Sequence, residues 1–364
     1  MNTIGYIKQV IYDEICAFKE EVKESKALAI AFLMVVVGLI VYLKPFPDRH
    51  IYFLTGYPGS DWTVLSEAAS GILKNNGLDF SIIHTEGAVE NVARLDDSED
   101  KANAGLTYGL ALEGSEVDGI YSLGSVNYEP IWILYNKAKV GEVKSLTELA
   151  QHKIGLGPVQ SGSYRIAKKI FEVANIKVEG NPNFSSDSIR VNQDKFKKGE
   201  LDGIILVSTN LDPVTKDLLR APNSTVYDFK NAPAYARQIN SFVTLTLPLD
   251  SVSIANQTPQ KDVTLLATTA SLVVQRSMHP DLQLAILMAA KDANRNSPNL
   301  FFAQRDEFPS YRDPSIPISP VAEHFYNYGP PHAMKYLPYW LAGFVDRSWL
   351  LLLTILAVFY PLSK

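Results

Sequence analysis

Short apolar runs alternate with amphipathic stretches along most of the chain. Runs rich in β-branched and aromatic residues predict strands, whereas apolar residues that recur at helical spacing predict helices. The predicted strands cover residues 51–54, 80–84, 104–108, 131–135, 153–156, 203–207 and 263–274. The predicted helices cover residues 61–75, a stretch that starts near 88, 162–174 and 281–293. This order indicates an α/β fold in which helices cross between parallel strands.

A longer apolar run at residues 27–43 contains no charged side chain. Its length is near the lower limit for a helix that crosses a bilayer, which needs about 17 to 25 residues. Lysines are more frequent before the run than after it, which favours an N-terminus on the inner side of the membrane. A cleaved signal peptide is the alternative, but the charged stretch before the run is long and no small-residue cleavage site follows it. We expect residues 1–26 to be cytoplasmic and residues 27–43 to form a transmembrane helix.

A second apolar run, at residues 348–362, lies at the other end of the chain. It is short for a membrane span unless residues 340–345 contribute, and a buried C-terminal helix is the alternative. We favour a second transmembrane helix at 341–362. The preceding residues, 301–340, are rich in proline and tyrosine and are expected to form a juxtamembrane segment.

Composition and charge exclude several classes of function. The chain has 364 residues and a formal net charge of −5, with no basic stripe of the kind that binds nucleic acid. A lipid-attachment cysteine would follow the apolar run. The one cysteine of the chain, Cys16, precedes it, so we do not expect lipidation there. None of the six histidines has metal-ligand spacing, and neither a nucleophile turn nor a phosphate-binding lysine loop occurs. We therefore expect no enzyme activity, no cofactor, no metal and no nucleic-acid partner.

Three predicted strand-to-helix turns combine glycine with hydroxyl side chains, at residues 55–60, 85–88 and 157–163. Glycine lets the backbone approach a ligand, and the free N–H groups at the start of a helix favour an anion. In α/β sheets ligands bind beyond the carboxyl ends of strands, where such turns lie. Serine and glycine are also ordinary helix caps, and that interpretation stays open for each residue.

The same turns carry a resemblance to the TAXI-type solute receptors of TRAP transporters, which covers residues 51–290. The matching elements, in order, are the turn at 55–60, Thr-Glu-Gly-Ala-Val-Glu-Asn at 85–91, Tyr-Glu-Pro at 128–130, Leu-Thr-Glu-Leu at 146–149, Gly-Leu-Gly-Pro at 155–158, Gln-Ser-Gly-Ser at 160–163 and Gly-Glu-Leu-Asp-Gly at 199–203. The proline-rich tail resembles a membrane-anchored subgroup. Departures occur at Tyr57, where a second glycine is usual, at Ala88, where serine is usual, and at Asn103 and Tyr108.

The resemblance implies a two-lobed, type II periplasmic-binding-protein-like fold that closes on a small organic acid, either a dicarboxylate or an amino acid such as glutamate. It also implies a bacterial inner membrane location, a binding domain that faces the periplasm, and the TRAP membrane subunits as partners besides the lipid bilayer. Because a tethered receptor cannot diffuse between transporters, a ligand sensor that signals to a membrane partner is the alternative function. An enzyme built on the same fold is a further rival.

We expect a binding domain at residues 49–300. Lobe one would contain residues 49–144 and 250–295, and lobe two residues 145–249. Backbone N–H groups and hydroxyls would bind a carboxylate, while two tyrosines would cover an apolar part of the ligand. The expected ligand-binding residues are Tyr57, Ser60, Thr85, Gly87, Tyr108, Tyr128, Ser161, Gly162 and Ser163.

Overall fold

The computed structural model describes most of the chain outside its two ends. The described residues are 48–112, 118–208, 213–221, 223–295 and 302–337, with 9, 12, 13, 30, 34, 35, 37, 38, 41, 342–346, 348–350 and 353 nearer the ends. The expected cytoplasmic segment and both expected transmembrane helices fall mainly outside these residues. Within the described part of the chain, no helix combines the length and the apolar character that a membrane crossing requires.

Two compact units make up the chain: Arg49–Gly329, and a unit formed by Met1–Asp48 with Pro330–Lys364. The 3-10 helix η2 (His332–Lys335) belongs to the second of these. The first unit contains the described strands and a cavity.

The first part of this unit is a parallel α/β arrangement, as the sequence predicted. β1 (His50–Leu54) pairs in parallel with β2 (Asp79–Ile83) and with β3 (Ala104–Thr107). α3 (Asp61–Asn75) connects β1 to β2, and α4 (Ala88–Asp96) connects β2 to β3. Ser60 fixes the start of α3, because its side chain accepts a hydrogen bond from the Thr63 N–H.

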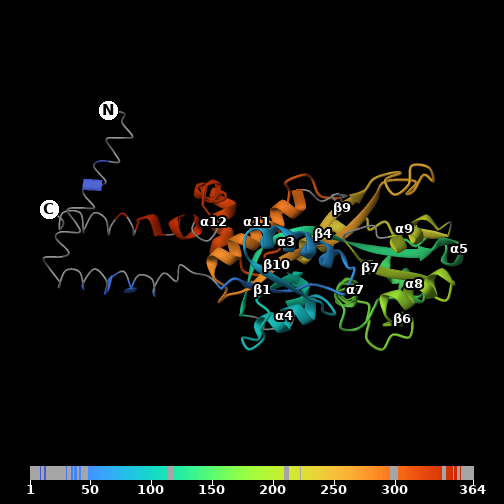
Figure 1. Cartoon of the computed structure of the whole chain (residues 1–364). Helices are drawn as coiled ribbons and strands as arrows, with labels where there is room; N and C mark the ends of the chain where they lie inside the picture. Colours follow the sequence, from blue (N-terminus) through green and yellow to red (C-terminus); the bar gives the residue numbers. More distant parts are fainter. Residues whose placement is uncertain are drawn as a thin grey trace. The chain divides into compact units, whose positions relative to one another are not determined.

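Two long antiparallel strands join this part to the rest of the unit. β4 (Ile120–Asn136) and β10 (Val263–Gln275) pair over most of their length, and β10 also pairs with β3 and β9 (Val243–Leu247). Figure 1 shows β4 continuing from the neighbourhood of α3 toward α9. The expectation of parallel strands throughout is wrong here, and the sheet is mixed. The sequence predicted only the apolar end of β4, because serines and other polar residues interrupt the pattern earlier in the strand.

The remaining strands form a second, smaller parallel group beside β4. β5 (Ile154–Gly155) pairs in parallel with β6 (Phe184–Ser185) and with β7 (Gly203–Val207). β7 and β8 (Ser224–Val226) both pair antiparallel with β4. The strand order is β2-β1-β3-β10-β4-β7-β5-β6, and β8 and β9 pair with β4 and β10 off this path.

Helices surround both groups of strands. Besides α3 and α4, the described helices of this unit are η1 (Gly109–Leu112), α5 (Lys137–Val140), α6 (Leu146–Leu149), α7 (Gly162–Val173), α8 (Ile189–Lys197), α9 (Pro213–Arg220), α10 (Ala232–Gln238), α11 (Pro280–Arg295) and α12 (Pro320–Tyr328). One cluster of buried apolar side chains includes Val92 of α4, Leu110 of η1 and Ile166 of α7. The start of α7 is thereby held close to η1.

Part of the expected juxtamembrane segment is folded onto the sheet. Ser125 and Ser310 exchange two backbone hydrogen bonds of 2.7 and 3.0 Å, and Ser122 donates to the Pro317 carbonyl at 2.8 Å. These bonds occur on a stretch of β4 that β7, which pairs with residues 131–135, does not reach. Ile316 is fully buried. Residues 308–319 are therefore a strap on β4, and the compact body extends to 329 instead of the expected 300.

Candidate ligand-binding site

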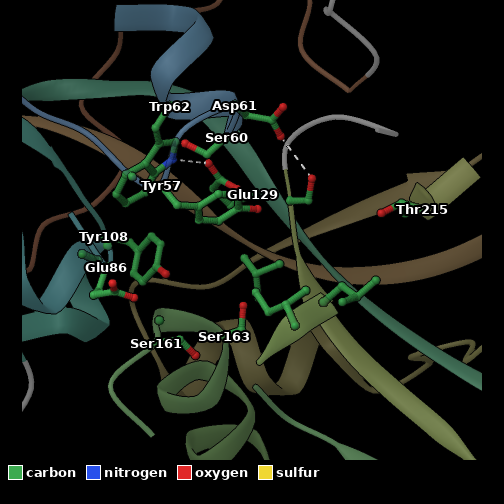
Figure 2. Close-up of a pocket in the computed structure, with 18 of the residues that line it drawn as sticks. Tyr57, Ser60, Asp61, Trp62, Glu86, Tyr108, Glu129, Ser161, Ser163 and Thr215 are labelled. Carbon is green, nitrogen blue, oxygen red and sulfur yellow. Dashed lines mark hydrogen bonds between the residues drawn. The ribbon is translucent and has the colours of Figure 1, made fainter. Parts of the chain in front are cut away.

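A cavity opens at the ends of several strands, where helices begin. Its lining includes the starts of α3, α4 and α7, together with Glu129 of β4 and residues 206–208 at the end of β7. Figure 2 shows Trp62 and Glu129 on one side of it, and Ser163 facing them from the first turn of α7. The cavity thus collects the turns that the sequence singled out, although they come from distant parts of the chain.

The turn before α4 is held by a buried polar network. The hydroxyl of Thr85 lies 2.6 Å from both the Thr55 carbonyl oxygen and the side-chain oxygen of Asn91. The Asn91 amide donates to the carbonyls of Thr55, at 2.9 Å, and Leu106, at 2.8 Å. Gly87 caps the helix with a φ of 126°, a conformation that side-chain-bearing residues rarely adopt. Thr85 therefore organises the turn from inside and does not line the cavity.

The first turn of α7 offers hydrogen-bond donors to the cavity. The Ser161 hydroxyl accepts from the Tyr164 N–H at 3.2 Å and donates to the Pro158 carbonyl at 2.7 Å, so it is engaged in capping. Within the described residues, the N–H groups of Gly162 and Ser163 have no acceptor. The buried Ser163 hydroxyl points toward the cavity (Figure 2). A free helix start of this kind favours a bound anion.

An aromatic wall with one carboxyl group faces α7. Trp62 donates its indole N–H to Glu129 Oε1 at 2.7 Å, and its ring makes an edge contact with Tyr108 at a centroid distance of 5.5 Å. Glu129 is only 3% exposed. Burial, together with the neighbouring Glu129 and Tyr57, raises the pKa of Tyr108. Tyr108 therefore presents a neutral phenol to the cavity at physiological pH.

A hydrogen bond spans the cavity beside this wall. Ser208, which follows β7, donates its hydroxyl to Asp61 Oδ2 at 3.1 Å, and the Trp132 indole donates to the Ser208 carbonyl at 3.2 Å. Asp61 is the first residue of α3, so this contact connects the two groups of parallel strands. Thr215 of α9 also lines the cavity and is almost fully buried.

The structure brings most of the expected ligand-binding residues to this one cavity. Those that line it are Tyr57, Ser60, Gly87, Tyr108, Ser161, Gly162 and Ser163. Tyr128 does not, because its hydroxyl donates to Glu307 at 2.5 Å and its ring packs edge-on against Phe308. Successive residues of a strand point to opposite faces, so the residue that reaches the cavity is its neighbour Glu129.

Several lining residues were not anticipated from the sequence. Asp61 and Trp62 lie in the first helical turn after a glycine-rich loop, and that position is itself a usable signal. Glu129 is the single charged residue of β4 and directly precedes its apolar end, which is a second signal. Ser208 and Thr215 have no comparable mark in the sequence. Among the residues described, no group of three or more His, Cys, Asp or Glu side chains could hold a metal ion.

Two groups of parallel strands, joined by long antiparallel strands and lined at their ends by helix starts, define a periplasmic solute-binding fold. The chain belongs to the NMT1-like family, whose model matches residues 53–296. This is a family of solute-binding proteins, whose members are periplasmic and generally not enzymes. No curated protein matches the chain at a significant level.

Solved structures that are similar to this chain include two bacterial proteins. The periplasmic aliphatic sulphonate binding protein SsuA from Escherichia coli is 12% identical, with a TM-score of 0.44 over 68% of this chain and 73% of SsuA. MatC from Rhodopseudomonas palustris, with bound malate, is 13% identical, with a TM-score of 0.44 over 83% of this chain and 97% of MatC.

Proposed function

We propose that the protein is a membrane-anchored extracytoplasmic receptor that captures a small organic acid, a dicarboxylate or an amino acid such as glutamate, for a TRAP-type transporter. The observation that carries the proposal is the start of α7, where two backbone N–H groups and the Ser163 hydroxyl face the cavity. A carboxylate placed there would accept these bonds and interact favourably with the helix dipole. Neutral donors at a helix start suit reversible capture, because they bind an anion without a permanent counter-charge.

Capture would occur by closure of two lobes. We assign residues 49–144 and 250–295 to lobe one and residues 145–249 to lobe two, and the strap at 308–319 to lobe one through its bonds to the early part of β4. Two contacts support this mechanism because each joins the two lobes across the cavity. They are the Asp61–Ser208 hydrogen bond and the packing of Tyr108 against Gly162.

The transport role and the location rest on sequence features. The apolar runs at 27–43 and 341–362 would anchor the receptor in a bacterial inner membrane with the cavity facing the periplasm. The TAXI-like motifs, most of which lie around the cavity, support a TRAP membrane complex as partner. Ligand sensing is the second candidate, and the strap favours it. It hydrogen-bonds to β4, which pairs with β10 of lobe one and with β7 of lobe two, and it precedes the C-terminal apolar run.

Native mass spectrometry of the full chain, purified in detergent, would test capture directly. We expect a co-purified organic acid, and binding of malate or glutamate by calorimetry after its removal. Ser163→Ala should weaken binding at least tenfold, since hydrogen bonds to charged groups contribute about 1.5 to 3 kcal/mol. Ser161→Ala is the matched control, because its hydroxyl is engaged in the cap. It should lower the free energy of unfolding by about 1 kcal/mol and affect affinity less.

Two results would contradict the proposal. One is the absence of any bound or binding carboxylic acid. The other is an affinity that Ser163→Ala leaves unchanged while Ser161→Ala abolishes it. Co-purification of the TRAP membrane subunits separates transport from sensing, because a sensor would be isolated with a different membrane partner.

A further inference from the structure

Tyr108 carries a hydroxyl group that the fold buries without a bond. The side chain lines the cavity and is 7% exposed, and within the described part of the chain its hydroxyl has no hydrogen-bond partner. Its ring packs edge-on against Trp62 and belongs to the same buried cluster as Ile166 of α7. Phenylalanine would pack in the same way and would avoid the cost of burying a polar group. The hydroxyl therefore indicates a partner that the protein itself does not supply.

Ser163 has a second hydroxyl of the same kind. It is 5% exposed and lines the cavity, and no described residue bonds to its hydroxyl oxygen. Figure 2 shows both hydroxyls at the first turn of α7, one from each proposed lobe. The N–H groups of Gly162 and Ser163 lie at the same helix start. These donors together indicate a ligand with several acceptor oxygens close to one another.

The donors approach a ligand from two directions. The N–H groups of the first helical turn point along the helix axis. The Tyr108 hydroxyl instead lies where a Cβ atom on Gly162 would be, at the side of the helix. A carboxylate bound end-on by the N–H groups therefore leaves the phenol to a different oxygen of the ligand. Because the phenol lies directly against Gly162, this oxygen has to be on the carbon next to the carboxylate.

Charge and pairing decide which ligand group suits this position. An ammonium group there would face the positive end of the α7 dipole, whereas an oxo or hydroxyl oxygen accepts from the phenol without that cost. Burial, with Glu129 and Tyr57 nearby, raises the pKa of Tyr108, so the phenol keeps its proton and remains a donor. A methylene group would leave the buried hydroxyl unpaired, and sites of this kind discriminate strongly against such analogues.

We propose that Tyr108 is the specificity-determining residue of the cavity and that it selects organic acids with an oxo or hydroxyl oxygen on the carbon next to the carboxylate. This inference rests on the proposed function, in which the start of α7 binds a carboxylate. Ser163 and the backbone N–H groups then bind the carboxylate, and Tyr108 binds the neighbouring oxygen. The ligand is narrowed to a 2-oxo or 2-hydroxy acid, and an amino acid with the same carbon skeleton ranks below it.

Calorimetry on the full chain in detergent tests this with acids that differ only at the carbon next to the carboxylate. One set is 2-oxoglutarate, 2-hydroxyglutarate, glutarate and glutamate. A second set is malate, succinate and aspartate, and a third is pyruvate, lactate, propionate and alanine. Within the set that binds most tightly, we expect an oxygen-bearing acid to bind at least tenfold more tightly than both the unsubstituted acid and the amino acid.

Two variants separate the roles of the two hydroxyls. Tyr108→Phe keeps the ring against Trp62 and removes only the hydroxyl. It should weaken binding of the oxygen-bearing acid at least tenfold and of the unsubstituted acid less than threefold, which removes most of the preference. Ser163→Ala should weaken binding of every acid in a set by a similar factor and keep the preference. Tyr164→Phe is the matched control, because this buried tyrosine does not line the cavity, and it should leave all affinities unchanged.

The wild-type comparison decides the matter even if Tyr108→Phe does not fold. Equal affinity for acids with and without the extra oxygen overturns the Tyr108 inference and leaves organic-acid capture standing. Tighter binding of the amino acid has the same consequence. A Tyr108→Phe variant that weakens every acid in a set equally also overturns the inference, since the phenol would then bind the carboxylate itself. Binding of none of the probes overturns both proposals.

Discussion

The ring and hydroxyl of Tyr108 occupy the space that a Cβ atom on Gly162 would need. Tyr108 follows β3, and Gly162 is the first residue of α7, so the contact joins the two proposed lobes at the cavity. Gly162 is required here for space, since its φ is outside the range that only glycine adopts readily. The observed approach of Tyr108 to the start of α7 therefore depends on the absence of a single side chain.

Gly162→Ala should prevent closure. The added methyl group overlaps a buried ring, so the lobes cannot reach the observed separation, and we expect at least a tenfold loss of ligand affinity. Small-angle scattering should show that ligand no longer reduces the radius of gyration. Gly71→Ala is the control, because nothing lies within 4 Å of the added atom in the middle of α3. It should leave binding unchanged and raise the free energy of unfolding by up to about 1 kcal/mol. Wild-type affinity in Gly162→Ala would show that closure does not need the Tyr108 contact.

Asp313 connects the strap to the region of the cavity. It is buried, and its carboxylate accepts hydrogen bonds from the Gly109 N–H at 2.8 Å, the Ser315 N–H at 3.0 Å and the Ser241 hydroxyl at 3.3 Å. Asp313→Ala removes all three bonds and leaves the buried Gly109 N–H without its acceptor, and we expect a loss of about 2 to 4 kcal/mol in the free energy of unfolding, measured with urea. The exposed Asp217→Ala should stay within about 0.5 kcal/mol of the wild type. Equal stability of the two variants would mean that the strap contributes little.

Asn91 organises two of the turns that form the cavity. Its amide donates to the buried carbonyls of Thr55 and Leu106, and its oxygen contacts Thr85, so its loss removes three buried hydrogen bonds. Asn91→Ala should lower the free energy of unfolding by about 2 to 4 kcal/mol and weaken ligand binding as well. Asn76→Ala removes an amide that donates to one exposed helix carbonyl, and it should cost less than about 1 kcal/mol. Urea unfolding and calorimetry on both variants separate the two effects. Full affinity in a destabilised Asn91→Ala would show that the turns keep their shape without this network.

The sequence predicts a helix or strand well where the capping residue, the apolar pattern and the neighbouring elements are close together in the chain. The bounds of α3 follow from Ser60 and the apolar spacing after it, and β1 to β3 are visible as short apolar runs. Most expected cavity residues also lie where glycine and hydroxyls mark a strand end. Features that depend on pairing between strands far apart in the sequence could not be predicted. The polar residues of β4 are buried only because β10 and the strap cover them, and neither partner is visible from β4 itself.

Tyr128 lies away from the cavity for a simple physical reason. The Tyr-Glu-Pro motif places two candidate side chains next to each other on a strand, and alternation sends only one of them into the cavity. Without the register of β4 there was no means to choose between the aromatic residue and Glu129. The proline-rich tail has the same ambiguity, since prolines are as common in a strap as in a linker. In both cases tertiary packing determines the outcome. Tyr128 packs against the buried Phe308, and the buried Ile316 holds the tail against the sheet.

The ion pair between Arg94 and Asp100 should make stability depend on pH in the acid range. The Arg94 guanidinium lies 2.7 Å from Asp100, and the Ala102 N–H donates to the same carboxylate at 2.8 Å. The hydrogen bond from Arg94, assisted by the one from Ala102, lowers the pKa of Asp100 below its usual value, although burial opposes the shift. A lowered folded-state pKa means that the unfolded chain takes up the proton first as the pH falls.

The stabilisation from Asp100 is therefore complete above its unfolded pKa, about 3.9, and disappears as the pH falls through the lower folded value. Asp100→Asn should reduce the free energy of unfolding by about 1 kcal/mol at pH 7, and the difference from the wild type should begin to shrink once the pH falls below about 4. Urea titrations at pH 7, 5, 4 and 3 measure this, with the exposed Asp118→Asn as the control. A difference that stays constant down to pH 3 would show that Asp100 stabilises the loop by shape and not by charge.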